Sequence, residues 1–200
     1  MLFFVGENGS GKSTLLEAIT DKCGFNTAAG GRNNSYEVHA AESVLGDYIR
    51  LSWMPKVTNG FFMRAESFYH FATHLEEVDE DGFQSYGGRS LHEQSHGESF
   101  LSLFLNHFNG RALYLLDEPE AALSPQRQLT LLAEIYRCAS DGAQFIIATH
   151  SPILLGIPNA EIFSFDNGKI HTCRYEETES YKVTELFINN RKRLLENLLD

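Results

Sequence analysis

The sequence predicts an α/β fold with three layers, in which helices cover both faces of a largely parallel sheet. Two observations support this class. A short apolar segment, residues 1–5, leads directly into a glycine-rich turn and then a helix. Later, residues 111–149 follow the order strand, helix, strand, and such βαβ units build parallel sheets. Because the chain has 200 residues, we expect one domain over residues 1–200.

The composition excludes several classes of protein. Hydrophobic residues make up 42% of the chain and charged residues 22%, as in globular domains. These values exclude a disordered chain, a collagen-like fibre and a coiled-coil rod. No apolar run approaches the ~18 residues that cross a bilayer, and the short apolar start lacks a signal-peptide pattern. We therefore expect no membrane-spanning segment.

Charge and cysteine content favour a cytoplasmic protein. The formal net charge of −11 argues against broad, charge-driven binding to nucleic acid or anionic lipid. A local basic contact stays open, and Arg191–Arg193 is the one dense basic cluster. Cys23, Cys138 and Cys173 are scattered and form no CxxC pair, so we expect them to be reduced packing residues.

The segment Gly6–Ser13 (GENGSGKS) matches the GxxxxGK[ST] pattern of a phosphate-binding loop. Its glycines let successive backbone N–H groups point at phosphate oxygens. The helix expected from Lys12 to about Thr20 adds the positive end of its dipole. Lys12 supplies a charge for the outer phosphates, and Ser13 supplies a hydroxyl for Mg²⁺. The predicted nucleotide-binding residues are Gly6, Asn8, Gly9, Ser10, Gly11, Lys12, Ser13 and Thr14.

A second buried strand, within Arg111–Pro119, ends in two carboxylates. Because the carboxyl ends of parallel strands line the ligand crevice, we expect Asp117 to hold Mg²⁺ together with Ser13. Glu118, one residue later, is expected to orient a water molecule and take its proton during attack on the terminal phosphate. The pair therefore predicts hydrolysis of the nucleotide, beyond binding alone.

A helix and a third strand complete the βαβ unit. Ser124 as N-cap and Pro125 at the first position predict a helix start, and one apolar face continues through Cys138. The strand Gln144–Thr149 then ends at His150, at the same sheet edge as Asp117. His150 is therefore the candidate contact for the γ-phosphate, and we group it with Glu118 as catalytic.

The middle of the chain is predicted to form a small helical and irregular lobe over residues 24–95. It should contain a loop over residues 24–35, a short helix near 42–49, and a short strand with a polar turn over 60–66. Two histidine pairs have the i, i+4 spacing of zinc ligands, His70 with His74 and His92 with His96, but neither has a third ligand in the pattern. We therefore expect no zinc site.

The C-terminal part is predicted to form a hairpin followed by helices. Asn167-Gly168 lies between two alternating segments, which is a strong hairpin pattern. Short helices are expected over residues 183–188 and 191–199.

Together these motifs resemble the nucleotide-binding core of the ABC-type ATPases. Gly6–Ser13 are similar to Walker A, and Leu113–Glu118 to Walker B with its catalytic glutamate. Glu120–Ser124 resemble the D-loop, and His150 resembles the switch histidine. Ser95–Ser99 (SHGES) resembles the LSGGQ signature and lies at the start of a helix expected over residues 98–108.

The resemblance runs from Met1 to about Pro152 and is best to the soluble branch of these ATPases. The stretches DEPEAALSP and ATHSP look like cytosolic ATPases related to SMC, RecF-like and overcoming-lysogeny ATPase heads, which are often labelled AAA-type. The resemblance implies a P-loop fold of ABC type, with ATP and Mg²⁺ as ligands. It also implies an ATP-dependent homodimer, in which Ser95 and Gly97 contact the γ-phosphate bound by the other chain.

Three departures from the family pattern affect these expectations. The signature has His96 and Glu98 in place of glycine and glutamine. No Q-loop glutamine is evident, so Glu66 is the candidate substitute, with Arg64 as a candidate phosphate contact. The chain starts five residues before the phosphate loop, without the family's leading strands. Either the chain is truncated or other residues hold the adenine base.

Three functions are compatible with these motifs. The first is a soluble ATPase switch that acts alone or with a protein effector in DNA maintenance or anti-phage defence. The second is the nucleotide-binding subunit of an ABC transporter, which needs a surface that couples to a membrane partner. The third is a module that binds ATP without hydrolysing it, and the intact Asp117-Glu118 pair disfavours it.

Overall fold

The computed structural model describes residues 1–27, 29–31, 44–54, 56–68, 70–73, 95–108 and 110–199. The described strands are β1 (Leu2–Val5), β2 (Gly60–Arg64), β3 (Leu113–Asp117), β4 (Gln144–Ala148), β5 (Glu161–Ser164) and β6 (His171–Cys173). The α-helices are α1 (Lys12–Cys23), α3 (His96–His107), α4 (Pro125–Ser140), α5 (Pro152–Leu155) and α6 (Glu179–Leu199). Short 3₁₀ helices are η1 (Val44–Tyr48), η4 (Pro119–Ala122), η5 (Asp166–Gly168) and η6 (Tyr175–Glu177).

All of these strands join one sheet with the order β2-β3-β4-β1-β5-β6. Every neighbouring pair is parallel except β5 with β6. Strand β4 lies between β1 and β3, so Ala148 is in register with Phe4 on one side and with Asp117 on the other. The carboxyl ends of β1, β3 and β4 are therefore neighbours at one edge of the sheet. They lead to the phosphate loop, to Glu118 and to His150, respectively.

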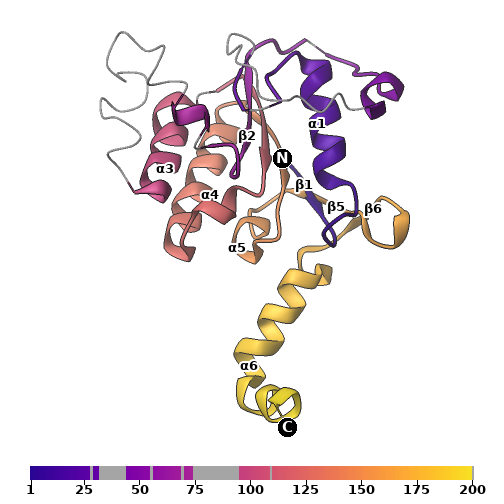
Figure 1. The fold of residues 1–200 in the computed structure, drawn as a ribbon, viewed down its shortest axis with the longest axis vertical. Coiled ribbons are helices and arrows are strands. Elements are labelled where there is room, and N and C mark those ends of the chain that lie inside the picture. The colour runs from indigo at the N-terminus through magenta and orange to yellow at the C-terminus, as the bar shows by residue number, and fades with distance from the viewer. Residues whose placement is uncertain are drawn as a thin grey trace.

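Helices cover both faces of the sheet, which confirms the predicted three-layer α/β class (Figure 1). Helix α1 lies on one face, and α3 and α4 lie on the other. Because side chains alternate along a strand, each strand supplies both layers. In β2, for example, Phe62 packs in the cluster with Leu16 of α1, whereas Phe61 and Met63 pack in the cluster with Phe104 of α3.

A chain of aromatic rings fixes the position of α3 against the sheet. Phe104 packs on Phe108, with ring centroids 4.3 Å apart, and Phe108 stacks on Tyr114 of β3 at 3.9 Å. Tyr114 in turn stacks on Phe145 of β4 at 5.0 Å. These buried contacts tie the helix that carries the signature-like segment to β3, which ends at Asp117, and to β4, which leads to His150.

The predicted motif-bearing elements are present, with small shifts in their ends. Helix α1 extends past Thr20 to Cys23, and Gly24 (φ 72°) ends it in the left-handed conformation. Helix α3 begins at His96, two residues before its expected start. Ser124 caps α4 by accepting a hydrogen bond from the Arg127 N–H, as the sequence predicted.

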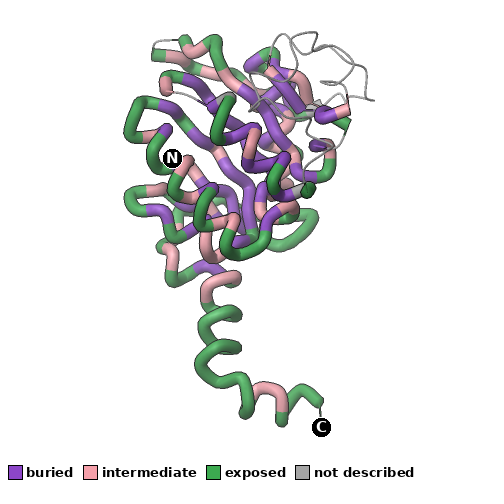
Figure 2. Tube along the Cα trace, turned by 90° about the vertical axis from the view of Figure 1, so that its left-hand side faces the viewer, coloured by how far each residue is buried: buried purple, intermediate pink, exposed green. Residues whose placement is uncertain are grey.

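The C-terminal part differs from the prediction in detail. The hairpin is confirmed, since Asn167 (φ 58°) and Gly168 (φ 69°) have the positive φ values that a tight type I′ turn requires. The two helices expected after it are present, because α6 is divided at Asn190, whose φ of −130° and ψ of 26° are not helical, and the first part begins earlier than expected, at Glu179. Helix α6 projects away from the sheet and is largely exposed along its length (Figures 1 and 2).

The expected lobe over residues 24–95 is described only in part. Strand β2 forms where a short strand was predicted, and it is the edge strand of the main sheet. The helix expected near 42–49 is a 3₁₀ helix, η1, where it is described. Within the expected loop 24–35, Gly30 pairs with Phe62 through two backbone hydrogen bonds. His74 and His92, and with them both candidate zinc pairs, lie outside the described residues.

Two searches of the described part of the chain gave no candidate. No helix there has the length and apolarity needed to cross a membrane. No cluster of three or more His, Cys, Asp or Glu side chains suited to a metal ion occurs among the same residues. Cys23, Cys138 and Cys173, which all lie within the described residues, form no disulfide, and the first two are buried.

Candidate functional site

The loop between β1 and α1 has a backbone that requires glycine. Gly6 (φ 139°), Gly9 (φ 82°) and Gly11 (φ 98°) all have positive φ values, which other residues rarely adopt. A side chain at Gly6 would also lie 3.0 Å from Asp166 Oδ1 and 3.1 Å from Ser10 Oγ. The Asp166 carboxylate accepts a hydrogen bond from the Glu7 N–H at 3.1 Å and so holds the loop against the hairpin.

Lys12, in the first turn of α1, crosses back over this loop. Its side chain is 4% exposed, and its Nζ donates hydrogen bonds to the carbonyl oxygens of Gly6 at 2.6 Å and Glu7 at 2.9 Å. Burial lowers the pKa of the Lys12 ammonium, and attraction from nearby carboxylates, foremost Glu118 and Asp117, offsets part of that effect. The ammonium therefore lies over the loop, close to several carboxylates.

Ser13 and Asp117 meet at the centre of the site. The Ser13 Oγ donates a hydrogen bond to Asp117 Oδ1 at 3.1 Å, although the residues are 104 positions apart in the chain. A hydroxyl and a carboxylate are the oxygen ligands that Mg²⁺ prefers, so this pair fits the ion that the motifs imply. Ser10 Oγ is buried and has no hydrogen-bond partner among the described residues, which fits a donor for a phosphate oxygen.

Glu118 adopts a strained backbone conformation next to this pair. Its φ and ψ values of 48° and 50° are left-handed, and its N–H donates to the Ala148 carbonyl at 2.9 Å. Strain of this kind is commonly retained where a side chain must be aimed at a functional site. The Glu118 carboxylate lies 3.8 Å from His150 Nε2, and both side chains are about two-fifths exposed.

Two residues hold His150 in place. Its backbone N–H donates to Glu120 Oε1 at 2.6 Å, and the hydroxyl of the next residue, Ser151, donates to Gln128 Oε1 at 2.6 Å. Burial raises the pKa of the Glu120 carboxyl, while the hydrogen bond from His150 acts in the opposite direction. The segment that resembles a D-loop is thus bonded directly to the residue that resembles the switch histidine.

A cavity of about 290 Å³ lies beside Ser13 and Asp117. Its lining residues are Ser13, Arg64, Ala65, Glu66, Asp117, Glu118 and Ala121. Glu66, the candidate for the Q-loop position, and Arg64, the candidate phosphate contact, therefore face the same cavity as the predicted magnesium ligands and the predicted base.

The signature-like segment forms the N-terminus of α3. Ser95 is the N-cap residue, and its N–H and hydroxyl donate to the Glu98 carboxylate at 3.1 Å and 2.6 Å. Arg127 of α4 donates to Glu98 Oε1 at 2.9 Å and to Ser95 Oγ at 3.3 Å. The hydrogen bonds from Ser95 lower the pKa of the Glu98 carboxyl. Gly97 lies against this group, since a side chain there would be 2.6 Å from Arg127 Nη1.

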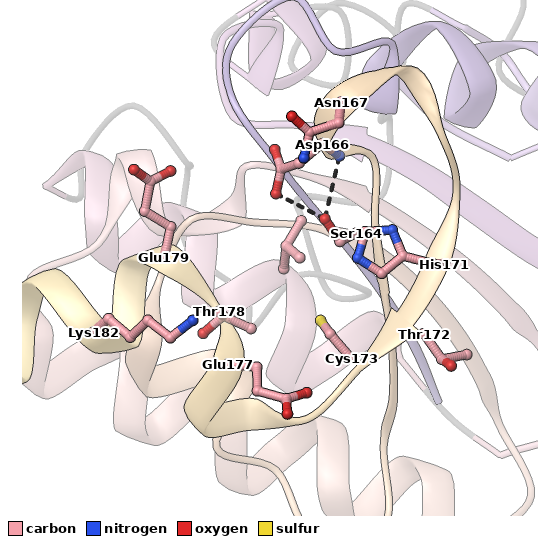
Figure 3. A pocket seen from close by; sticks show the side chains of 11 residues that line it. Ser164, Asp166, Asn167, His171, Thr172, Cys173, Glu177, Thr178, Glu179 and Lys182 are labelled. Atoms are coloured by element: carbon pink, nitrogen blue, oxygen red, sulfur yellow. Dashed lines mark hydrogen bonds between the residues drawn. The ribbon is translucent and has the colours of Figure 1, made fainter.

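A larger cavity, of about 580 Å³, lies between the hairpin and the start of α6 (Figure 3). Ser164 and Asp166 from the hairpin side face Glu179 and Lys182 of α6 across it. The Ser164 hydroxyl donates to Asp166 Oδ2 at 2.7 Å, while the other oxygen of Asp166 binds the phosphate loop. We therefore relate this cavity to the support of the loop, because the predicted catalytic side chains line the smaller cavity.

The structure brings most of the sequence-predicted residues to one sheet edge. Asn8 and Thr14 lie in the loop and the first turn of α1 and are exposed. Ser95 and Gly97 lie at the N-terminus of α3, where Ser95 bonds to Glu98 and Arg127 rather than to the phosphate loop. Arg127, Asp166 and Glu17 were missed by sequence reasoning. Of these, only Asp166 had a local signal, its position directly before the Asn-Gly turn.

One family model matches the chain. Its description is "AAA domain, putative AbiEii toxin, Type IV TA system", and it covers residues 84–156, which include the signature-like segment, Asp117, Glu118 and His150. No curated protein sequence matches the chain.

Several solved structures are similar to this one at low sequence identity. An ATP-binding subunit of an ABC transporter is 16% identical, covers 94% of this chain and 87% of its own, and has a TM-score of 0.48. The SMC head domain from Thermotoga maritima is also 16% identical, covers 86% of this chain and 89% of its own, and has a TM-score of 0.44.

Proposed function

We propose that this chain, which has the α/β core of an ABC-type ATPase, binds ATP with Mg²⁺ and hydrolyses it to ADP and phosphate. One observation carries the proposal. The Ser13–Asp117 hydrogen bond joins the phosphate loop to the strand that ends in Glu118, with Lys12 and His150 at the same sheet edge. These are the parts that phosphoryl transfer to water requires: a phosphate cradle, a metal ligand pair and a base.

In this proposal each residue has one task. The N–H groups of the loop and the Lys12 ammonium bind phosphate oxygens, and Lys12 exchanges its bonds to Gly6 and Glu7 for them. Mg²⁺, held by Ser13 and Asp117, would supply positive charge to the phosphate oxygens. Glu118 accepts a proton from water as the water oxygen bonds to the γ-phosphorus and the bond to the bridging β–γ oxygen breaks. His150 donates a hydrogen bond to the γ-phosphate.

Phosphate release from ATP, with and without Mg²⁺, tests the proposal. Lys12→Ala should reduce ATP binding and turnover by at least about tenfold, because it removes the one charge that spans the loop. Lys22→Ala is the matched control, since Lys22 lies on the same helix and, among the described residues, forms an ion pair with Asp47 at 4.0 Å. Equal turnover in the wild type and Lys12→Ala would contradict the proposed site.

We further propose that ATP joins two copies of the chain, with Ser95 and Gly97 of one copy completing the site of the other. The support is the exposed end of α3, where backbone N–H groups, Ser95 and Arg127 gather around a single carboxylate. Light scattering on Glu118→Gln tests this. A monomer that becomes a dimer only with Mg·ATP is expected, and a chain that binds ATP as a monomer would overturn the dimer.

The proposed biological role is a cytoplasmic ATP-gated switch that acts with a protein effector in defence or DNA maintenance. The matching family model supports defence, because its description names a type IV toxin–antitoxin system. The alternative is the nucleotide-binding subunit of a transporter. Co-purification with membranes would favour the transporter, whereas stimulation of the ATPase by DNA would favour maintenance.

A further inference from the structure

Arg64 has an unusual position for a cation in a phosphate-binding site. It is the last residue of β2, in register with Asp117, the last residue of β3. Its Nε donates to Asp117 Oδ2 at 2.8 Å, and its Nη2 donates to Glu17 Oε1 of α1 at 2.6 Å. The guanidinium also lies 5.9 Å from the centre of the Phe62 ring. One arginine thus links the candidate metal ligand to α1.

The burial of these groups makes the contact strong. The Asp117 side chain is only 3% exposed, and those of Arg64 and Glu17 are about a quarter exposed. Burial disfavours the charged form of Arg64, but attraction from Asp117 and Glu17 outweighs it and raises the pKa of the guanidinium. Arg64 is therefore a permanent cation inside the site.

Arg64 competes with Mg²⁺ for the same carboxylate. Asp117 Oδ1 accepts from Ser13, and Asp117 Oδ2 accepts from Arg64. A divalent ion held by Ser13 and Asp117 would repel the guanidinium beside it, since two cations cannot share one buried carboxylate without cost. The metal therefore weakens the bond that holds Arg64 against Asp117.

The open space next to Arg64 is the cavity lined by Ser13, Asp117 and Glu118. Arg64 is the only cation among the described residues that line it, because Lys12 bonds to the loop carbonyls. The proposed chemistry places the terminal phosphate beside Ser13 and Glu118. A guanidinium has five donors in a planar fork, which suits two oxygens of a phosphate.

From this geometry we infer that Arg64 recognises the terminal phosphate and makes the site prefer ATP over ADP. Asp117 and Glu17 hold the guanidinium at the wall of the cavity, from which it would turn to the γ-phosphate if Ser13 and Asp117 held Mg²⁺. The inference rests on the proposed ATP site and adds a residue that senses the third phosphate. The simpler alternative is a structural counter-ion that never contacts the nucleotide.

Equilibrium binding of Mg·ATP and Mg·ADP distinguishes a γ-phosphate contact from a structural counter-ion. Only a γ-phosphate contact affects the binding of ATP without affecting that of ADP. Arg64→Met should reduce the preference for ATP over ADP by about tenfold or more, with Mg·ADP affinity little changed. Arg64→Lys should keep part of the preference, since it keeps the charge without the fork. A structural counter-ion predicts equal changes for both nucleotides, and that result would overturn the inference.

Glu17→Gln provides a second test that leaves Asp117 paired. It releases Arg64 from one of its two carboxylates, so it should increase the preference for ATP a few-fold. This variant decides the question alone if Arg64→Met fails to fold, as judged by its thermal unfolding. An unchanged ratio in Glu17→Gln would then overturn the inference.

Binding of ATP and ADP by the wild-type protein distinguishes a failure of the proposed ATP site from a failure of the proposed role of Arg64. If it binds neither nucleotide, both the ATP site and the role of Arg64 fall. If it binds both nucleotides and every variant keeps the wild-type ratio, the ATP site stands and only the role of Arg64 falls.

Discussion

Two regions of this chain carry the polar groups of the proposed ATP site, and they are held in different ways. In the phosphate-loop region (Gly6–Ser13 with Asp117, Glu118 and His150), neighbouring strands of one sheet set the positions. In the signature region (Ser95–Ser99 with Arg127), one exposed helix end and one side chain of α4 set them. The first region pairs Asp117 with a cation, whereas the second pairs its donors with the Glu98 carboxylate.

The charges differ in a way that matches the proposed ligands. Asp117, the expected metal ligand, is bonded to the positive Arg64. The donors of Ser95, expected to meet a phosphate, are bonded to the negative Glu98. In each region, therefore, a side chain of the protein has the same sign of charge as the proposed ligand: Arg64 is positive like Mg²⁺, and Glu98 is negative like a phosphate. ATP binding in the first region should not depend on the second, and variants can separate them.

The largest expected effect is in the phosphate-loop region. Glu118→Gln removes the base but preserves the shape of the side chain, so turnover should fall by about 100-fold or more while Mg·ATP still binds. Phosphate release and equilibrium binding measure the two quantities. Glu177→Gln is the control, because Glu177 is a surface residue of η6, and it should leave turnover unchanged. Wild-type turnover in Glu118→Gln would remove Glu118 from the role of base.

The next largest effect is expected from Gly97→Ala, which should disturb the signature region alone. Gly97→Ala places a methyl group 2.6 Å from Arg127 Nη1 and 3.0 Å from the Ala122 carbonyl, so Arg127 must move away. Turnover should fall about tenfold because one set of donors to the γ-phosphate is misplaced. Mg·ATP should still bind to the monomer as in the wild type. Loss of ATP binding in this variant would show that the two regions are not independent.

A smaller effect in the opposite direction is expected from Glu98→Gln. Glutamine keeps the cap on α3 but removes the negative charge from the helix end that should meet a phosphate. In a Glu118→Gln background, the Mg·ATP concentration for half-maximal dimerisation should fall about fivefold. Glu177→Gln is the matched control, since Glu177 forms the same kind of cap with Arg174. An unchanged dimerisation curve would mean that Glu98 does not face the phosphate of another copy.

The phosphate-loop region also differs from the long-range contacts in how much of it could be predicted from the sequence. The phosphate loop, Asp117, Glu118 and His150 were predictable because each follows a strand within a few residues, so a local pattern is sufficient. The contact between Arg64 and Asp117 depends on β2 and β3 being neighbours in register, which no local pattern states. Likewise, the bond from Arg127 to Glu98 joins residues of two helices that are 29 positions apart in the chain. Long-range pairings of this kind are set by the packing of the sheet and its helices.

The smallest expected effect concerns Glu120, whose carboxylate accepts a hydrogen bond from the His150 N–H. Burial raises the pKa of Glu120 in the folded chain, so the folded state binds this proton more tightly than the unfolded state. This tighter binding adds to the free energy of unfolding. The contribution is complete at pH values below the pKa of Glu120 in the unfolded chain and is lost as the pH rises through its pKa in the folded chain. Glutamine does not titrate, so the stability of Glu120→Gln does not fall in this way as the pH rises. Its Oε1 can still accept a hydrogen bond from the His150 N–H.

The melting temperature of Glu120→Gln should therefore exceed that of the wild type by about 1–3 °C at pH 7.5, with the difference shrinking toward zero near pH 4. Thermal unfolding at several pH values measures it. Glu177→Gln should show the opposite dependence, because hydrogen bonds from Arg174 lower the pKa of Glu177, and its contribution is lost as the pH falls. A difference for Glu120→Gln that does not change with pH would show that Glu120 is not held in the buried position beside His150.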